Sequence, residues 1–502
     1  MKLKVFYTDL GEDFVFLHPN DATMLELLPS SLLRITSKVT GQTVTGRVMV
    51  SANFVPKQGS VGIPKLFHNH FPADELVEVL PVHFEEGKGI LTKMLHNQQL
   101  SDEEIKLFIE GITNHEVTSI QTSAFMLTQH FKSIDLKEVE VIAKAFADSG
   151  NKFEWKGPVY DKHSIGGVPG NKVSLLIVPI LAAAGLLVPK VSTKAITSAS
   201  GTVDTMGLLT NVDFNPDELY EICSKTKGAI VSGERLKIAP TIDVIIEQAG
   251  YPLGIDPPSL ILAGITSKKV AMGVDFLVLD VPVGKTNETK FNLSEGRAWG
   301  RTFVDLAQSL GMTAKIGLTY GSVPVGHTIG PALEAREGLS TLMDPKHAPN
   351  SLVEKSTALA GLVFEMAGMS NRGHGQSYAL EILQSGKAYA KMRSIIEAQG
   401  GDPEIKPEDI PLAPHSVDIT APANGWPVEI KNKALTAVAR AAGAPVHPGA
   451  GVEILTKKES VKKGEVIMRV YAHSDSAIDE VRAIIAKTQP IVIEGLLMGT
   501  IS

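Results

Sequence analysis

A glycine-rich turn over residues 162–172, KHSIGGVPGNK, constrains this chain most, because it leads directly into the apolar run Val173–Ala184. The apolar run predicts a buried helix. Glycines let backbone N–H groups approach an anion closely, and a helix N-terminus adds a dipole of favourable sign. Lys162 and Ser164 supply further donors. The turn is not a P-loop, because Asn171 separates the glycine from the lysine. It predicts either a phosphate site or a structural connection.

A second polar segment, residues 190–204, favours the ligand interpretation. Its sequence, KVSTKAITSASGTVD, holds six hydroxyl side chains and begins as a short strand. Hydroxyls at a strand end can be ordinary turn and cap residues. This density of donors, one strand–helix unit after the glycine-rich turn, suits an oxyanion or a sugar better.

These two segments resemble the pair of phosphate-binding motifs in the thymidine phosphorylase family. Ser267-Lys268-Lys269 and the later LVLDVPVGK resemble the base-side segment of that family. The resemblance covers residues 90–500, with SDEEI near residue 101 and DSG near residue 148 also fitting it. Over the whole chain, the similarity extends to the archaeal-type AMP phosphorylases and their bacterial relatives, the type 2 thymidine phosphorylases.

The resemblance implies a pentosyltransferase that cleaves the N-glycosidic bond of a nucleoside 5′-monophosphate or a nucleoside by phosphorolysis. The products would be the free base and either (deoxy)ribose 1-phosphate or ribose 1,5-bisphosphate. This chemistry needs no metal or redox cofactor, and inorganic phosphate is a substrate. Two alternatives stay open: a thymidine phosphorylase proper, and a nucleotide-binding sensor without catalysis.

The family's functional residues can be carried over to matching positions. His163 would point toward the base and sugar, although an ordinary buried turn histidine is the alternative. Phosphate would be held by Lys162, Ser164, Ser174, Ser192 and Thr202. Other substrate contacts would come from Gly167, Thr193, Lys194, Ala195, Ile196, Thr197, Ser198, Gly264, Lys268 and Lys290.

The base-side residues depart from the thymidine phosphorylase pattern. The arginine and serine that grip thymine would fall near Gln248 or Ala249 and at Gly264, so both pyrimidine contacts are missing. Residues 254–257, Gly-Ile-Asp-Pro, instead resemble the Ser-Ile-Asp-Pro stretch of AMP phosphorylases. Asp256 would then be the general acid, a role that needs a pKa raised by an apolar surrounding. A helix N-cap is the compatible structural interpretation of Asp256.

Composition limits the remaining classes. A length of 502 residues predicts about three or four structural units. The net charge of −7 gives no basic footprint for nucleic acid or an anionic membrane. The single cysteine, Cys223, excludes an intramolecular disulfide.

No apolar run approaches about 18 residues, and acidic residues interrupt the N-terminal segment too early for a signal sequence, so a cytoplasmic protein is expected. His68 and His70 lack a third nearby ligand, so no metal is expected.

Element patterns predict a multidomain α/β protein. Residues 1–87 form a β-rich, barrel-like domain, and residues 88–155 with 243–273 form a discontinuous helical domain. Residues 156–242 with 274–400 form a central, mostly parallel α/β domain, in which 320–322 and 326–331 share one sheet layer. Residues 415–502 form a C-terminal α+β domain like a barrel sandwich. The resemblance further implies a homodimer or larger homo-oligomer.

Overall fold

The computed structural model describes the chain except residues 9–13, 30, 53–56, 83, 196–197, 286–287, 457–459 and 496–502. It divides into two compact units, each built from separate stretches of sequence. The first holds Met1–Gly150 and Ala239–Lys268, and the second holds Asn151–Ile238 and Lys269–Ser502. No helix within the described ranges is long and apolar enough to cross a membrane.

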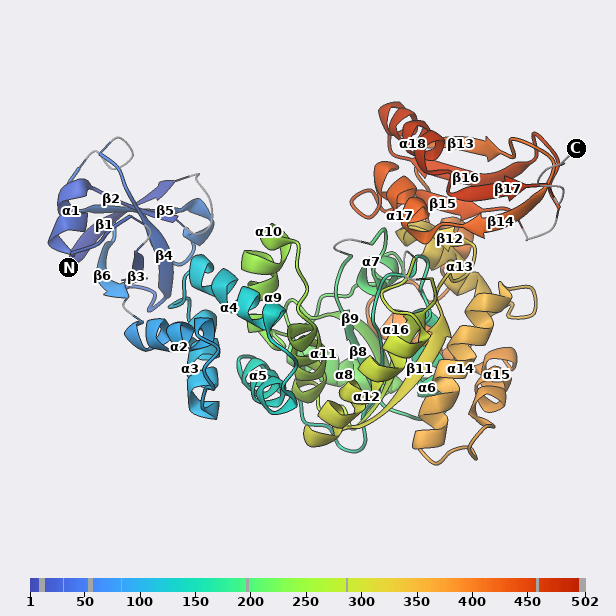
Figure 1. Cartoon of the computed structure of the whole chain (residues 1–502), viewed down its shortest axis with the longest axis horizontal. Helices are drawn as coiled ribbons and strands as arrows, with labels where there is room; N and C mark the ends of the chain where they lie inside the picture. The colour runs from blue at the N-terminus through green and yellow to red at the C-terminus, as the bar shows by residue number, and fades with distance from the viewer. Residues whose placement is uncertain are drawn as a thin grey trace, which may run out of the picture. The chain divides into compact units, whose positions relative to one another are not determined.

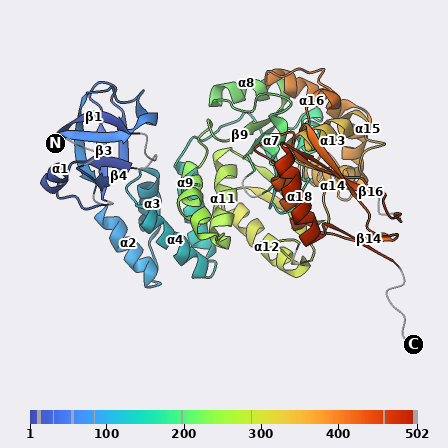
Figure 2. The ribbon, with the colours of Figure 1, turned by 90° about the horizontal axis from the view of Figure 1, so that it is seen from above.

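A closed six-stranded barrel begins the first unit, in the order β1-β5-β2-β4-β3-β6, and β6 pairs with β1 to close it (Figures 1 and 2). Alternate strand residues point inward, so side chains such as Leu33, Ile35 and Ile63 are fully buried. The predicted barrel is confirmed. Its elements are β1 (Lys2–Thr8), β2 (Phe14–Leu17), α1 (Pro19–Met24), β3 (Leu32–Thr36), β4 (Thr43–Val50), β5 (Ser60–Pro64), η1 (Lys65–Phe67) and β6 (Leu76–Val82).

Helices make up the rest of the first unit. The predicted capping box of Ser101 and Glu104 opens α3, and Asp135 caps α5 by accepting from the backbone N–H of Lys137. The later stretch packs on the earlier one: the hydroxyls of Thr113 and Thr241 lie 2.5 Å apart. These helices are α2 (Glu85–Leu95), α3 (Asp102–Thr113), α4 (Ser119–Phe131), α5 (Leu136–Asp148), α9 (Pro240–Ile245), η2 (Ile246–Gly250), α10 (Tyr251–Leu253) and α11 (Pro258–Ala271).

Parallel strands form the centre of the second unit. One sheet has the order β11-β10-β7, another pairs β8 with β9, and a parallel bridge between Val159 and Leu187 joins their edges. The strands are β7 (Tyr160–Ser164), β8 (Val188–Ser192), β9 (Gly228–Ser232), β10 (Phe276–Val283) and β11 (Thr313–Tyr320). Because parallel strands run the same way, the turns after β7 and β8 emerge on one edge.

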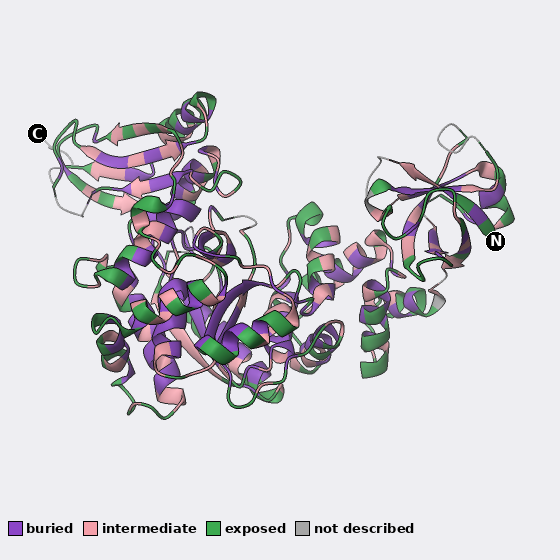
Figure 3. Ribbon diagram, turned by 180° about the vertical axis from the view of Figure 1, so that it is seen from behind, coloured by how far each residue is buried: buried purple, intermediate pink, exposed green. Residues whose placement is uncertain are grey.

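Helices cover this sheet, whose strands are mostly buried in Figure 3. The predicted buried helix is α6, and its residues from Ser174 to Ala182 are buried, because helices and strands surround it. The helices are α6 (Ser174–Ala183), α7 (Thr202–Met206), α8 (Pro216–Thr226), α12 (Leu293–Ser309), α13 (Pro331–Met343), α14 (Asn350–Met366), α15 (Gly375–Gln384), α16 (Lys387–Ala398) and η3 (Pro407–Asp409).

The C-terminal part of the second unit is antiparallel α+β, with one sheet in the order β12-β15-β16-β13 and a second pairing β14 with β17. Its own core includes Leu435, Val452 and Val470. Its elements are β12 (Thr328–Ile329), β13 (His415–Thr420), β14 (Trp426–Ile430), α17 (Asn432–Ala441), β15 (Gly451–Ile454), β16 (Val466–Ala472), α18 (Asp475–Thr488) and β17 (Ile491–Glu494).

The sequence-based placement of residues 326–331 in the central sheet layer is wrong. Strand β12 pairs with β15 of the C-terminal sheet, with Thr328 opposite Glu453 and Ile329 opposite Val452. Ile329 is fully buried in the C-terminal core. Two extended residues between glycine turns carry too little pattern to specify which sheet edge they join.

We predict that Gly375→Ala destabilises the second unit. A Cβ at this position would lie 2.1 Å from the carbonyl oxygen of Gly361, because α14 and α15 approach backbone to backbone. Relieving such overpacking typically costs about 1–3 kcal/mol, so the melting temperature should fall. Ser377→Ala, at an exposed position of the same helix, is the control and should melt like the wild type. Equal melting of both variants would contradict the close approach.

Candidate functional site

The glycine-rich turn connects the carboxyl end of β7 to α6, as predicted. Gly167 and Gly170 have positive φ angles of 99° and 71°, which other residues rarely adopt. A Cβ on Gly170 would also lie 2.6 Å from the carbonyl oxygen of Val325 and 2.7 Å from that of Thr328. The turn therefore needs glycine both for its backbone angles and for the close approach of a second loop.

Lys172, at the end of this turn, serves the scaffold. Its fully buried ammonium group donates to the carbonyl oxygens of Val325 (3.1 Å) and Thr328 (3.2 Å) and pairs with the carboxylate of Glu337. The ammonium lowers the pKa of Glu337 although burial of that carboxyl acts in the opposite direction. Lys172 thus ties the glycine-rich turn to residues 325–328.

Six charged side chains from β7, β8, β10, α11 and α14 are packed together near the glycine-rich turn. Asp161 lies 2.6 Å from the ammonium of Lys269 and 3.5 Å from that of Lys190. Asp280 lies 3.0 Å from Lys355 and 3.9 Å from Lys162. Each is at most 6% exposed. We call this set the buried charge cluster: Asp161, Lys162, Lys190, Lys269, Asp280 and Lys355.

The buried charge cluster holds four lysines against two aspartates, an excess of two positive charges when all are ionised. Burial, opposed by Asp280 and assisted by Lys355, lowers the pKa of Lys162 to about 8. Burial likewise lowers the pKa of Lys190 to about 7, against the attraction of Asp161. Unpaired charge is costly in a protein interior, so an anionic ligand at this place would be strongly favoured.

The predicted phosphate residues of the first segment lie around this cluster. Lys162 and Ser164 alternate with His163 along β7, so the first two share one face of the strand and His163 points to the other. The ammonium of Lys162 donates to the hydroxyl of Ser164. Ser174 is buried at the start of α6, and the predicted contact Gly167 is exposed on the turn.

The second polar segment begins at Ser192, the last residue of β8, and Thr202 is the first residue of α7. The carboxylate of Asp204 closes the intervening loop by accepting from the backbone N–H groups of Ala195 (2.6 Å) and Gly201 (2.9 Å). Arg440 of α17 donates to the carbonyl oxygen of Ser198.

Other predicted contacts in this loop differ in exposure. Thr193 and Lys194 are exposed, and Lys194 pairs with the exposed Glu234 at 3.3 Å. Ile196 and Thr197 lie outside the described residues. The predicted contact Lys290 is also exposed, on the loop that follows β10.

Three predicted residues belong to the first unit. Asp256 is exposed, two residues before α11 begins. Gly264 lies on α11, where a Cβ would come within 3.0 Å of Ile242. The ammonium of Lys268 donates to the carboxylate of Asp243 at 2.6 Å.

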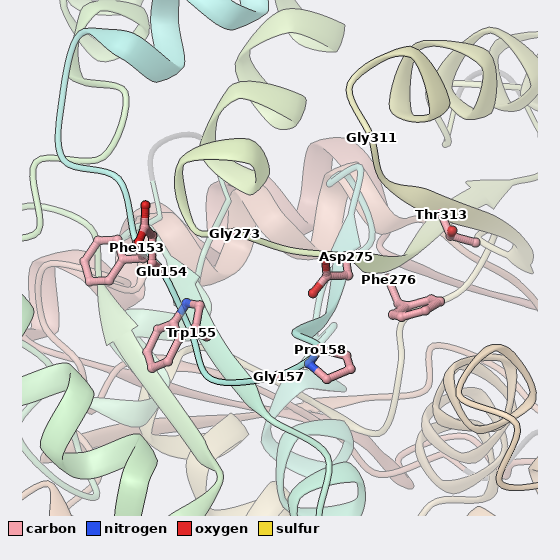
Figure 4. A pocket seen from close by; sticks show the side chains of 10 residues that line it. All are labelled: Phe153, Glu154, Trp155, Gly157, Pro158, Gly273, Asp275, Phe276, Gly311 and Thr313. Atoms are coloured by element: carbon pink, nitrogen blue, oxygen red, sulfur yellow. The ribbon is translucent and has the colours of Figure 1, made fainter.

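A pocket of about 620 Å³ lies at the opposite edge of the central sheet, before β7, β10 and β11 begin (Figure 4). Its lining includes Trp155, Asp275 and Thr313, and none of the predicted site residues. Ligands of parallel sheets bind beyond the carboxyl ends of the strands, so this pocket does not compete with the glycine-rich turn as the candidate site.

Of the six members of the buried charge cluster, only Lys162 was predicted from the sequence as a site residue. The available signal was a charge inside an otherwise apolar strand, as in the run around Asp280, FLVLDVPV. Lys269 was noticed only as a neighbour of Lys268, yet its partner is Asp161. Lys355 could not have been found, because only the packing of α14 brings it to Asp280.

Models of known families match most of the chain. The helical bundle domain of the glycosyl transferase family matches residues 88–150, and the a/b domain of that family matches residues 156–389. The pyrimidine nucleoside phosphorylase C-terminal domain matches residues 426–492. The solved anthranilate phosphoribosyltransferase from Thermus thermophilus shares the fold, with a TM-score of 0.52 and 17% identity over 62% of this chain and 99% of that chain. The matches define a glycosyl transferase with a helical bundle and an α/β domain.

Relatives that match over their full length narrow this class. The AMP phosphorylase of Thermococcus kodakarensis is 41% identical over 100% of this chain and 99% of its own. The AMP phosphorylase of Methanosarcina barkeri is 41% identical, covering 100% and 98%, and that of Pyrococcus furiosus is 38% identical, covering 100% and 99%. The chain belongs to the thymidine phosphorylase and AMP phosphorylase family, as its two polar segments predicted.

The charge excess predicts that the protein binds a dianion more weakly as the pH rises. Lys190 and Lys162 lose their protons as the pH passes about 7 and about 8. Each lost charge-assisted contact costs about 1.5–3 kcal/mol, so sulfate affinity should fall at least tenfold between about pH 6.5 and 9. Sulfate is a suitable probe because it remains a dianion throughout. Calorimetric titration at each pH gives the affinity, and its repetition in buffers of different ionisation enthalpy gives the protons taken up.

Two lysine variants serve as the comparison. Lys162→Ala should weaken sulfate binding about tenfold or more at neutral pH. Lys225→Ala removes an exposed lysine of α8 in the same unit and should leave the titration unchanged. Sulfate affinity that stays constant over the whole pH range would exclude the buried charge cluster as an anion site.

Proposed function

We propose that this protein cleaves the N-glycosidic bond of a nucleoside 5′-monophosphate with inorganic phosphate, releasing the base and ribose 1,5-bisphosphate. The observation that carries the proposal is the buried charge cluster, whose excess of positive charge, two when all six groups are ionised, suits a phosphate dianion. Family membership and the full-length AMP phosphorylase relatives support the choice of a nucleotide as the second substrate.

In this proposal, residues of the second unit bind the attacking phosphate. Lys162 supplies an ammonium group at the carboxyl end of β7, beside Ser164, whose hydroxyl accepts from that ammonium. The hydroxyls of Ser174, Ser192 and Thr202 supply neutral donors. Holding the phosphate oxygen against C1′ of the ribose makes the attack effectively unimolecular. The C1′–O bond forms while the C1′–N bond breaks through an oxocarbenium-like transition state, which the phosphate charge stabilises.

The departing base takes the electron pair of the broken bond and needs a proton. We assign the donor role to Asp256 of the first unit. This carboxyl group is exposed, so the desolvation that would favour its protonated form has to come from the bound substrate itself. Lys268, whose ammonium already donates to Asp243, is the proposed contact to the base.

Preference for a monophosphate rests on what surrounds the sugar and the base. The positions that would hold the thymine-binding arginine and serine carry Gln248 or Ala249 and Gly264. A site without those buried polar contacts loses most of its discrimination for thymine. Lys194 and Lys290 are exposed cations on the loops that follow β8 and β10, and a 5′-phosphate can use such charges.

The experiment compares kcat/KM for AMP, CMP and UMP with those for adenosine, cytidine, uridine and thymidine at fixed phosphate. We expect at least one monophosphate to exceed its nucleoside by about tenfold or more, since one charge-assisted contact is worth that much. Asp256→Asn should lower kcat for that monophosphate by about 100-fold or more, because general acid catalysis typically contributes that factor. Asp102→Asn, an exposed aspartate of the same unit, should behave like the wild type.

Other outcomes identify the alternatives. Faster turnover of thymidine or uridine by more than about tenfold would make the protein a thymidine phosphorylase in substrate as well as family. Nucleotide binding without any phosphate-dependent base release would make it a sensor. Unchanged turnover in Asp256→Asn would remove Asp256 from the chemistry.

We also propose that the protein self-associates through its helical part. On α4, Ile120, Leu127 and Phe131 are 73%, 38% and 82% exposed, and their spacing places them along one face of the helix. A row of exposed apolar side chains of this kind marks a surface suited to association. Sedimentation at micromolar concentration should therefore give at least a dimer. Replacing Ile120 and Phe131 with aspartate should shift the protein to monomer, whereas a wild-type protein that sediments only as monomer contradicts the proposal.

A further inference from the structure

Asp280 is a fully buried carboxylate in the middle of β10, the central strand of its sheet. Its strand neighbours Leu279 and Val281 are fully buried apolar residues. In the sheet register it lies opposite Ser164 of β7 on one side and Gly317 of β11 on the other. A buried charge in such a strand persists only where specific partners compensate it.

Both carboxylate oxygens of Asp280 have partners. Oδ1 accepts from the hydroxyl of Thr319 at 2.6 Å, and Oδ2 accepts from the hydroxyl of Ser164 at 2.6 Å and from the amide of Asn171 at 3.4 Å. The ammonium groups of Lys355 and Lys162 lie 3.0 and 3.9 Å from Oδ2. The attraction of these lysines outweighs the effect of burial and lowers the pKa of Asp280.

These contacts use the whole hydrogen-bonding capacity of Ser164. A serine hydroxyl has one donor and two acceptor positions. The oxygen accepts from the ammonium of Lys162 and from the amide of Asn171 at 3.2 Å, and the proton goes to Asp280. Ser164 therefore holds Lys162, and can donate to an anion only if it releases Asp280. The ammonium of Lys162, with three protons, has donors beyond the one given to Ser164.

We propose that Asp280 is the positioning residue of the phosphate site, which fixes the Ser164 hydroxyl and, through it, the Lys162 ammonium at the carboxyl end of β7. Asp280 itself does not touch the phosphate. This inference rests on the proposed use of phosphate. The simpler alternative is that Asp280 only neutralises Lys355. Asp280 does form an ion pair with Lys355 at 3.0 Å, but the hydroxyls of Ser164 and Thr319 also donate to it at 2.6 Å each, and neutralising Lys355 does not need these bonds.

Asp280→Asn is the first test, because it keeps the side-chain shape and removes the charge. We expect KM for phosphate to rise at least about tenfold, with KM for the nucleotide within about twofold and kcat within about threefold of the wild type. The loss of the negative charge should also lower the pKa of Lys162 further, since Asp280 is the group that raises it most. The alkaline limb of kcat/KM for phosphate should accordingly move to lower pH, an effect that a general loss of folding would not produce.

Other charged groups near this site also influence the pH dependence of kcat/KM for phosphate. Lys162 and Asp161 contribute from β7, Lys190 from β8, Lys269 from α11 and Lys355 from α14. Of these charged groups, Lys355 and Lys162 pair with the Asp280 carboxylate, at 3.0 and 3.9 Å. Asp21→Asn, which removes an equally buried carboxylate from the N-terminal barrel, is the control and should alter neither KM for phosphate nor the pH profile.

A double variant separates positioning from neutralisation. Asp280→Asn with Lys355→Met removes one charge of each sign, so it keeps the net charge of the buried charge cluster and guards against unfolding of the single variant. If Asp280 positions Ser164 and Lys162, the double variant retains the raised KM for phosphate and the shifted alkaline limb. If instead KM for phosphate returns to within about twofold of the wild type and the alkaline limb returns to its wild-type pH, the proposal is overturned and Asp280 is only a counterion of Lys355.

Calorimetry with inorganic phosphate distinguishes a failure of this inference from a failure of the proposed function. If the wild type releases no base but binds phosphate, and Asp280→Asn binds it at least about tenfold more weakly, the positioning role stands without the activity. If both proteins bind phosphate equally, the positioning role is wrong whatever the activity.

Discussion

The structure of the second unit depends on accommodating six ionisable side chains, four lysines and two aspartates, inside a parallel sheet and the helices that cover it. Asp161 and Asp280 each pair with lysines that come from other elements, and no member of the buried charge cluster is more than 6% exposed. Such an arrangement is costly unless its geometry is good. The apolar helix α6 and the strands beside it supply the rigid surroundings in which that geometry is held.

Loops around the site are shaped by the C-terminal part of the same unit. Arg440 donates to the carbonyl oxygen of Ser198 on the loop after β8, and Asn432 donates to that of Gly321 after β11. The backbone of Lys433 donates to Glu288 on the loop after β10. Strand β12, which follows one of these loops, is itself part of the C-terminal sheet. Three loops at the carboxyl edge of the central sheet are therefore fixed by contacts from one later stretch of sequence, which makes that stretch part of the site's framework.

Local sequence patterns predicted much of this architecture. The capping box at Ser101, the β-rich, barrel-like character of residues 1–87 and the buried helix α6 follow from short-range signals: cap residues, alternation and an unbroken apolar run. Pairings between distant segments were not predictable in the same way. The edge that Thr328 and Ile329 join, and the approach of Lys355 to Asp280, depend on packing across the whole unit. A two-residue strand and a single lysine on a helix carry no local signature of either.

The same distinction applies to the candidate site. The side chains expected to touch phosphate stand in two conspicuous motifs, but the groups that govern their charge lie in strands and helices whose sequences look structural. Burial brings Lys190 to a pKa of about 7 and Lys162 to about 8, so the cluster can reduce its positive excess by releasing protons. A bound dianion would neutralise that excess with the protons retained. Since the two responses compete, anion binding and proton binding are coupled at this site by the charge count alone, before any movement of the chain is considered.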